Sequence, residues 1–231
     1  MNLFNFRRRY TVLLVHLGDN FVEVGLVGLE KKKSPKLICS LREGFNLGEA
    51  GLFYALGDAL HRLLHISTKS LHRSGYPQVV DHALVTLSAN WTTCYTMTHK
   101  EEGDLVFDNK YLEEVLNTKE REFVSTLLTG YELVHSDIIK LFLNGYPAQP
   151  LETTRTMHVD MEIFLTTASN TFMRKVEKVI GRAFGLKRGI QFMSFPVVAF
   201  KLFGHDVRED YVARESLPIL ATFTHSYLLA K

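Results

Sequence analysis

The stretch YTVLLVHLGDNFVEVGLV, residues 10–27, decides how this chain begins to fold. Its first part is a dense apolar run, which is typical of a buried strand. The Gly-Asp-Asn sequence at 18–20 supplies turn chemistry, and strand-like residues resume over 21–29. The stretch therefore predicts a β-hairpin.

A third strand, a helix and a buried strand are expected after the hairpin. Residues 36–41 are strand-like and follow an exposed turn at 30–35. Apolar residues then recur at helical spacing, namely Phe53, Leu56, Leu60, Leu63 and Leu64. We expect the polar segment 67–77 to end this helix and 79–87 to form the next strand.

The second half of the chain also mixes strands and helices. We expect loose alternation at 91–99, a loop at 101–104, a helix capped by Asp108, and strands at 132–142 and 156–166. Ser169 should cap a further helix ending near Gly185, followed by a strand at 191–195, a helix that Pro196 starts, and a last strand at 216–223. The pattern predicts an α/β (α+β) protein.

The strand at 156–166 alternates most clearly. Its apolar side carries Met157, Val159, Met161 and Ile163, and its polar side carries His158, Asp160 and Glu162. With His135 and Asp137 on a neighbouring strand, the polar side could form a metal site of imidazole and carboxylates. A solvated sheet face already explains this spacing, so we expect no metal.

Composition narrows the class of protein. The 231 residues are 46% hydrophobic and 23% charged with a net charge of +2, so the chain is globular and nucleic acid is not an expected partner. Cys39 and Cys94 lie in strand-like runs, where a reduced cysteine acts as a small hydrophobe. No stretch is apolar enough to span a membrane, so we expect a cytoplasmic protein.

The first residues contain Leu3, Phe4 and Phe6 followed by arginines at 7–9, the reverse of the order in a secretory signal. This patch could touch a membrane surface, and a frayed terminus is the simpler interpretation. We therefore expect at most peripheral membrane association.

Three stretches together resemble the N-terminal half of the actin-like FtsA/PilM group of cell-division and pilus-assembly proteins. They are the hairpin quoted above, HALVTLSANWTTCYTM at 82–97, and KLFLNGYPAQP at 140–150 followed by MHVDMEIFLTTASNTFMRKVEKVIGRAFGLKRGIQFMSFPVVAF at 157–200. The resemblance implies a partial actin-like, ribonuclease H-like lobe with an inserted SHS2-like strand–helix–strand–strand module. It divides the chain into lobe residues 1–90, the module at 91–189, and a return to the lobe with an atypical tail at 190–231.

The first phosphate loop of that group, D-x-G-[ST]-x-x-[VI]-K, matches the hairpin poorly. His16 stands for the aspartate, Asp19 for the hydroxyl residue and Glu23 for the lysine, while Gly18 is retained and Asn20 follows in the turn. A triphosphate with magnesium needs a carboxylate ligand, a hydroxyl and backbone N–H groups, and acidic residues repel it. We therefore expect no nucleotide cofactor and no catalysis.

The segment after residue 203 matches neither the second phosphate hairpin nor the adenosine-binding loop of the group. A truncated fragment of an actin-like ATPase is therefore one alternative. An enzyme with an unrecognised site around His16 and Asp19 is another.

We expect the protein to bind a protein partner or a second copy of itself in a cell-division or envelope machine. The expected contact residues are Trp91, His158, Asp160 and Glu162. A core position for Trp91 is the alternative, since a lone tryptophan beside a strand is usually buried.

Overall fold

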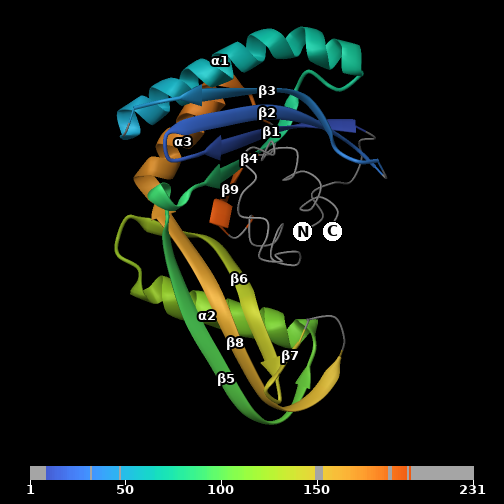
Figure 1. Cartoon of the computed structure of the whole chain (residues 1–231), viewed down its shortest axis with the longest axis vertical. Helices are drawn as coiled ribbons and strands as arrows, with labels where there is room; N and C mark the ends of the chain where they lie inside the picture. Colours follow the sequence, from blue (N-terminus) through green and yellow to red (C-terminus); the bar gives the residue numbers. More distant parts are fainter. Residues whose placement is uncertain are drawn as a thin grey trace, which may run out of the picture. The chain divides into compact units, whose positions relative to one another are not determined.

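The computed structural model of this protein describes residues 9–31, 33–46, 48–148, 153–186, 189–196 and 198 (Figure 1). They form two compact units. The second unit is Thr92–Phe172, and the first unit comprises the described residues up to Trp91 and from Met173. Both units combine helix with sheet, so the predicted α/β class is confirmed.

The first unit contains a five-stranded mixed sheet. Its strands are β1 (Arg9–Leu17), β2 (Phe21–Glu30), β3 (Lys36–Gly44), β4 (Val80–Leu87) and β9 (Ile190–Ser194). They lie in the order β3-β2-β1-β4-β9, with β2 antiparallel to β1 and β3, and with β4 parallel to β1 and β9. This order and these directions are those of the ribonuclease H-like lobe that the sequence resemblance implies.

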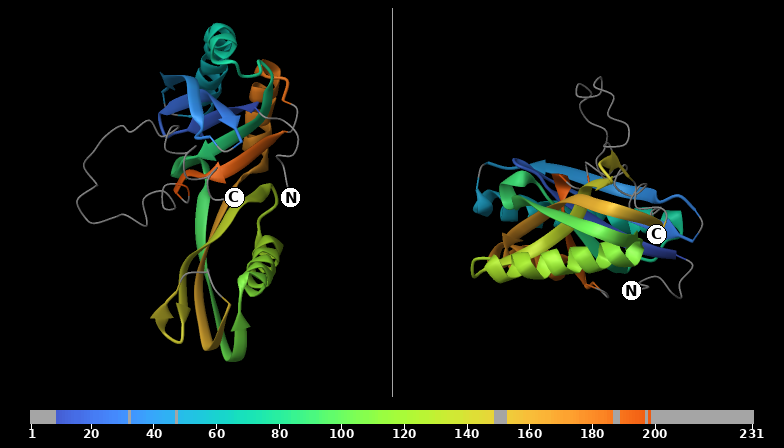
Figure 2. Two further views of the ribbon diagram at one scale, coloured as in Figure 1. Left: turned by 90° about the vertical axis from the view of Figure 1, so that its right-hand side faces the viewer. Right: turned by 90° about the horizontal axis from the view of Figure 1, so that it is seen from below.

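Helices cover the sheet of the first unit. Helix α1 (Glu49–Ser74) packs on β2 and β3, and Lys175 of α3 (Asn170–Ala183) forms an ion pair of 2.9 Å with Glu49 (Figures 1 and 2). Strands β1, β2, β4 and β9 contribute to a buried hydrophobic cluster that contains Val12, Leu14, Val27, Leu29, Leu84, Met193 and Val198. Because side chains alternate along a strand, His16 lies on the same face of β1 as Val12 and Leu14.

The predicted end of the first helix is wrong. Helix α1 continues through the polar segment to Ser74 and ends at Gly75, which has φ 72°. The hydroxyl of Ser67 donates to the Leu64 carbonyl and that of Ser70 to the Ile66 carbonyl, so the helix itself satisfies these polar groups. Leu71 is buried and holds the last turns against the core.

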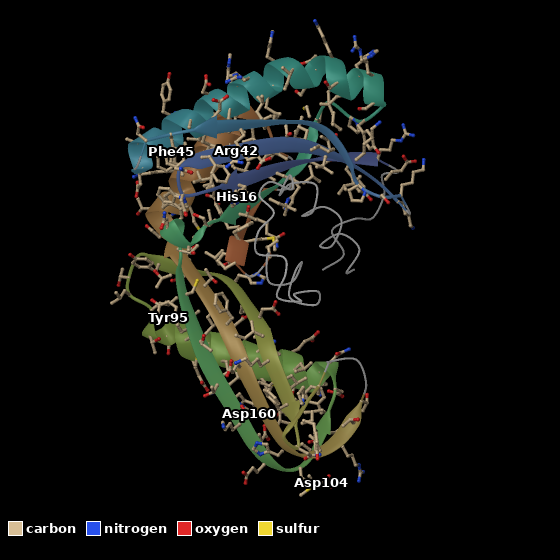
Figure 3. All side chains as sticks on the ribbon, viewed as in Figure 1. His16, Arg42, Phe45, Tyr95, Asp104 and Asp160 are labelled. Atoms are coloured by element: carbon tan, nitrogen blue, oxygen red, sulfur yellow. The ribbon has the colours of Figure 1, made fainter. Side chains whose placement is uncertain are left out.

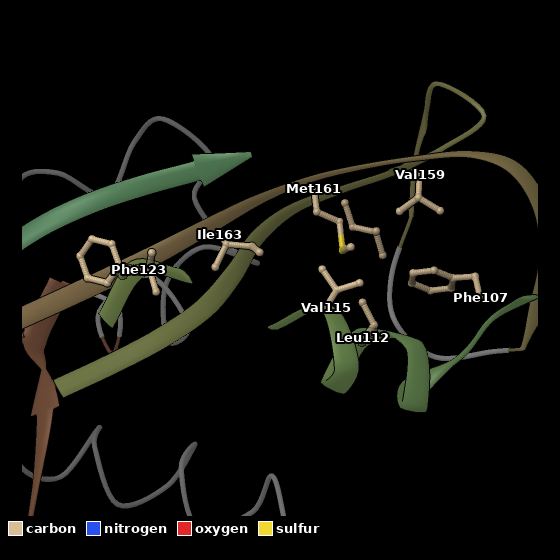
Figure 4. Close-up of a cluster of buried hydrophobic side chains, with 9 residues drawn as sticks. Phe107, Leu112, Val115, Phe123, Val159, Met161 and Ile163 are labelled. Atoms are coloured by element: carbon tan, nitrogen blue, oxygen red, sulfur yellow. The ribbon is translucent and has the colours of Figure 1, made fainter. Parts of the chain in front are cut away.

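The second unit contains a four-stranded antiparallel sheet and one helix. Its elements are β5 (Thr93–Phe107), α2 (Asn109–Thr126), β6 (Tyr131–Leu143), β7 (Tyr146–Pro147) and β8 (Thr154–Ser169), with strand order β5-β8-β6-β7. In Figure 4, Leu112 and Val115 of α2 point toward Met161 of β8, and these residues are buried. Asp108 caps α2 as predicted, its Oδ1 accepting from the Tyr111 N–H at 2.8 Å.

The loop predicted at 101–104 is wrong, because β5 runs through it as one strand. The pairing with β8 is shifted between Glu102 and Leu105, and Gly103 between them has φ 140°. Glu102 and Asp104 are exposed on alternate positions. Glu102 and Asp104 are thus on the solvated side of an irregular strand, whereas Glu101 accepts from the Tyr111 hydroxyl at 2.7 Å.

The predicted division of the chain needs one correction. The module was expected to end at 189, whereas the second unit ends at Phe172, and α3 from Met173 belongs to the first unit. The amphipathic face of α3 buries Val176 and Ile180, and Lys175 pairs with α1 of the first unit. The expected leader at 3–8, the helix at 197–203 apart from Val198, and the strand at 216–223 lie outside the described residues. Within the described part of the chain, no helix combines the length and apolarity that a membrane span requires.

Candidate functional site

The hairpin turn between β1 and β2 is fixed by contacts from three segments. The Gly18 N–H donates to the Phe21 carbonyl at 2.9 Å, and the Gly18 carbonyl accepts from the Trp91 indole N–H at 2.8 Å. The Asp19 carboxylate accepts from the Ser88 hydroxyl at 2.6 Å, and the Asn20 carbonyl accepts from the Phe45 N–H at 2.9 Å. The turn is therefore bonded to the residues that follow β4 and β3.

His16, at the end of β1, is part of the core. It is 2% exposed, its Nδ1 lies 3.0 Å from the Thr86 hydroxyl, and the rings of Phe21 and Phe195 lie 5.4 and 4.6 Å from its own (Figure 3). Burial, helped by the positive charge of Arg42 and opposed by Asp19, lowers the pKa of His16 to about 4. The imidazole is therefore neutral at pH 7.

The ring of Phe21 fills the space beside Gly18. A Cβ atom at Gly18 would lie 2.6 Å from the Phe21 ring, and the guanidinium of Arg42 lies 3.7 Å from the centroid of that ring. This is cation–π geometry, which holds the ring in place. Phe21 and Arg42 were not predicted from sequence, since their contact depends on the β2–β3 register.

Charged and polar side chains form a row across four strands next to the turn. Arg42 of β3 is opposite Glu23 of β2, Glu23 is opposite His16 of β1, and His16 is opposite Thr86 of β4. Glu23 is 9% exposed, and burial raises its pKa while Arg42 opposes that rise. The row contains one cation, one shielded acid and a neutral imidazole.

These residues do not fit a magnesium–triphosphate pair. His16 supplies no carboxylate at the end of β1, and aromatic rings pack around it. Asp19 supplies a negative charge where a hydroxyl is needed, and its oxygen already accepts a hydrogen bond. Like charges near phosphate oxygens are unfavourable.

The polar face of β8 carries His158, Asp160 and Glu162 in cross-strand pairs. Lys100 of β5 lies 2.9 Å from Asp160, which is labelled in Figure 3, and Lys140 of β6 lies 2.8 Å from Glu162. The third pair, between His158 and Glu102, is longer at 3.6 Å. We call this surface the polar face of the second sheet, defined by Lys100, Glu102, Lys140, His158, Asp160 and Glu162.

The apolar alternation of β8 is interrupted at its start. Val159, Met161 and Ile163 are fully buried as expected, whereas Met157 is 62% exposed. The Asn144 Oδ1 accepts from the backbone N–H groups of both Met157 and His158. Two successive N–H groups directed at one acceptor do not fit a flat strand, so the side-chain alternation shifts there.

Two other sequence hypotheses have a clear position in the structure. Trp91 is half-buried, bonded to Gly18 and 6.4 Å from the Phe45 ring, so its role here is to hold the hairpin turn. His135 and Asp137 lie on β6, which does neighbour β8. Among the residues that the structure describes, no three His, Cys, Asp or Glu side chains are arranged to hold a metal ion.

Comparisons with known proteins found structural likeness at low sequence identity. No family model and no curated protein matches this chain. A chain of the PilM–PilN type IV pilus biogenesis complex is 12% identical with a TM-score of 0.45, over 83% of this chain and 49% of that one. The cytoplasmic domain of EpsL, an inner-membrane component of the type II secretion system of Vibrio cholerae, is 10% identical with a TM-score of 0.37, over 82% and 58%.

A protein of Bacteroides thetaiotaomicron with an actin-like ATPase fold and unknown function is 8% identical with a TM-score of 0.39, over 88% of this chain and 60% of that one. The chain thus spans between about half and three fifths of the length of these solved chains. The resemblance of the first unit to an actin-like lobe is one of strand order and strand directions.

Proposed function

We propose that this chain is a non-hydrolytic assembly protein, related to the FtsA/PilM group, that binds a protein partner in a cell-division, pilus or other envelope machine. The observation that carries the proposal is the filled phosphate-loop position. There the Phe21 ring lies against Gly18 and a buried neutral imidazole replaces the carboxylate that would hold magnesium. A lobe of this fold that does not bind nucleotide can still present surfaces that bind other proteins.

The same geometry weighs against an enzyme centred on His16 and Asp19. A general base must reach its substrate, and His16 is 2% exposed beneath aromatic rings. Asp19 is exposed but bonded to Ser88.

Calorimetric titration of the full chain with ATP and magnesium tests the absence of nucleotide binding. We expect no saturable heat up to about 1 mM ATP, a limit equivalent to a binding free energy of about −4 kcal/mol. Micromolar affinity would contradict the proposal. If the double variant Asp19→Arg, Glu23→Arg also changed that affinity, the nucleotide would be bound near the hairpin turn, and the contradiction would be stronger.

The proposed partner surface is the polar face of the second sheet. Lys100 of β5 and Lys140 of β6 each face an acid of the central strand β8, so reversing the two lysines places like charges side by side and changes the charge pattern that a partner would meet. We expect Lys100→Glu with Lys140→Glu to abolish partner capture or self-association in crosslinking and sedimentation experiments. The matched control is Lys110→Glu with Lys119→Glu on α2, which reverses the same charge elsewhere in the second unit. If the two double variants retain or lose partner capture and self-association equally, this surface is not the partner surface.

A further inference from the structure

Basic residues from three separate parts of the sequence meet at one end of the first unit. We call this surface the basic end. It consists of exposed residues of the β1 start, the β2–β3 connection and the last turns of α1, namely Arg9, Lys31, Lys33, Lys36, Lys69, His72 and Arg73. It is separate from the hairpin turn at Gly18, which lies at the opposite end of β1.

Strand register and specific contacts place these segments together. Arg9 is opposite Glu30 at one end of the β1–β2 pair, and Lys36 is opposite Gly28 in the β2–β3 pair. The Arg9 guanidinium donates to the Gly75 carbonyl at 3.1 Å, directly after the end of α1. Figure 1 shows the C-terminal end of α1 on the same side of the first unit as the start of β1.

Tyr76 completes the junction between α1 and the strands. Its ring lies against Gly28, where a Cβ atom would be 2.6 Å away, and the Arg9 guanidinium lies 5.7 Å from its centroid. The last turn of α1, with His72 and Arg73, is therefore held beside the β1 start and the β2–β3 connection.

The charge of the basic end is strongly one-sided. Over residues 59–80 the sequence contains no Asp or Glu, and over 28–37 Glu30 is the sole acid. Glu30 is shared by Arg9 at 3.2 Å and Lys33 at 3.0 Å. Asp81, which follows residues 59–80, is buried and accepts from the Thr11 N–H. The helix dipole favours cations in the last turn of α1, but it gives no reason for Lys31, Lys33 and Lys36.

The segments that supply these cations also carry exposed aliphatic side chains. Leu37 adjoins Lys36 and is 37% exposed, Val79 precedes β4 and is 44% exposed, and Ile66 lies one turn before Lys69 on α1 and is 39% exposed. Cations alone suit any polyanion, whereas aliphatic groups between cations gain free energy by entering the boundary between lipid headgroups and acyl chains.

We propose that the basic end docks on an anionic phospholipid bilayer. Each Lys or Arg near such a surface contributes about 1 kcal/mol, and the attraction falls with added salt. The contact is peripheral and reversible, and it does not depend on the proposed role of the polar face of the second sheet. A nucleic acid would use the same cations but would gain little from Leu37 and Val79, so it serves as the competing outcome of the test.

The test is co-sedimentation of the full chain with vesicles of phosphatidylcholine alone and of phosphatidylcholine mixed with phosphatidylglycerol. We expect binding to the mixed vesicles and loss of that binding when sodium chloride is added. The variant Lys33→Glu, Lys36→Glu, Arg73→Glu should bind them more than about tenfold more weakly, since three charges are reversed. The control Lys110→Glu, Arg174→Glu, Lys178→Glu changes the net charge equally on exposed helix positions and should bind within about twofold of the parent.

A second variant separates lipid from other polyanions. Leu37→Ser with Val79→Ser keeps every charge, and we expect it to weaken vesicle binding while leaving retardation of duplex DNA unchanged. Circular dichroism melts confirm that each variant is folded before it is compared. The proposal is overturned if the parent does not bind the mixed vesicles, if the two triple variants bind them equally, or if duplex DNA alone is bound through the basic end.

Discussion

At the scale of single residues, His16 is a polar residue that forms part of the core. Its ring is enclosed by Phe21 and Phe195, and its Nδ1 contacts Thr86, so the side chain is satisfied without solvent. Protonation would place a charge in this enclosure next to Arg42. The neutral form of His16 therefore suits the folded state above pH 6.5, whereas its protonation in acid destabilises the folded state.

The pH dependence of stability follows from that pKa. The folded protein holds His16 with a pKa of about 4, against 6.5 in the unfolded chain, so the unfolded state binds the proton first as pH falls. The contribution of His16 to the free energy of unfolding should be fully present above pH 6.5 and should fall between pH 6.5 and 4, by up to about 3 kcal/mol, with no further loss from this group below pH 4. Urea unfolding across this range measures it.

Two histidine variants make that pH dependence specific. His16→Gln should flatten the slope of stability against pH between 6.5 and 4. His61→Gln, at an exposed position of α1, should leave the slope as it is in the parent. If both variants retain the parent slope, His16 is not the group responsible.

At the scale of elements, the β1–β2 hairpin requires glycine at position 18 because of a side-chain contact and not because of an unusual backbone angle. The structure does not place Gly18 in the left-handed region, and the need for glycine comes from the Phe21 ring, which would overlap a Cβ atom at 2.6 Å. Gly18→Ala should therefore destabilise the protein by about 1–3 kcal/mol, the usual cost of overpacking.

A double-mutant cycle tests the cause. In the background of Phe21→Leu, Gly18→Ala should cost less than half as much, because the smaller side chain leaves room for the methyl group. Gly181→Ala is the control, since a Cβ there meets no atom within 4 Å, and it should be neutral or stabilising by up to about 1 kcal/mol. Additive effects of Gly18→Ala and Phe21→Leu in thermal and chemical unfolding would contradict the steric explanation.

Elements with a strong local pattern were predicted correctly from the sequence. The hairpin, β4 and the cap of α2 at Asp108 follow from dense apolar runs and one capping side chain. The last turns of α1 and the middle of β5 were not predicted, because polar residues there are accommodated by back-bonded hydroxyls and by an irregular strand. Likewise, the sequence identifies the turn at residues 18–20, but the contact between Phe21 and Arg42 depends on strand register.

At the scale of the whole molecule, each unit contains a core of its own. The cluster with Val12 and Leu84 belongs to the first unit, and the cluster with Phe107 and Met161 belongs to the second. The second unit runs from Thr92 to Phe172, and near these ends Thr93 of β5 pairs with Thr167 of β8. Paired residues of an antiparallel ladder are about 5 Å apart, so the second unit begins and ends at one place, as an inserted segment does.

An excised fragment of residues 92–172 should therefore fold by itself. Its helix already covers one face of a sheet whose central strand pairs with both neighbours, so the buried cluster is complete within the fragment. We expect a dispersed NMR spectrum and a cooperative thermal transition. A fragment of residues 92–148 is the control: it lacks β8, which pairs with both β5 and β6, and should be unfolded. If the longer fragment is as disordered as the shorter one, the second unit depends on the rest of the chain, and its binding properties would have to be tested in the full protein alone.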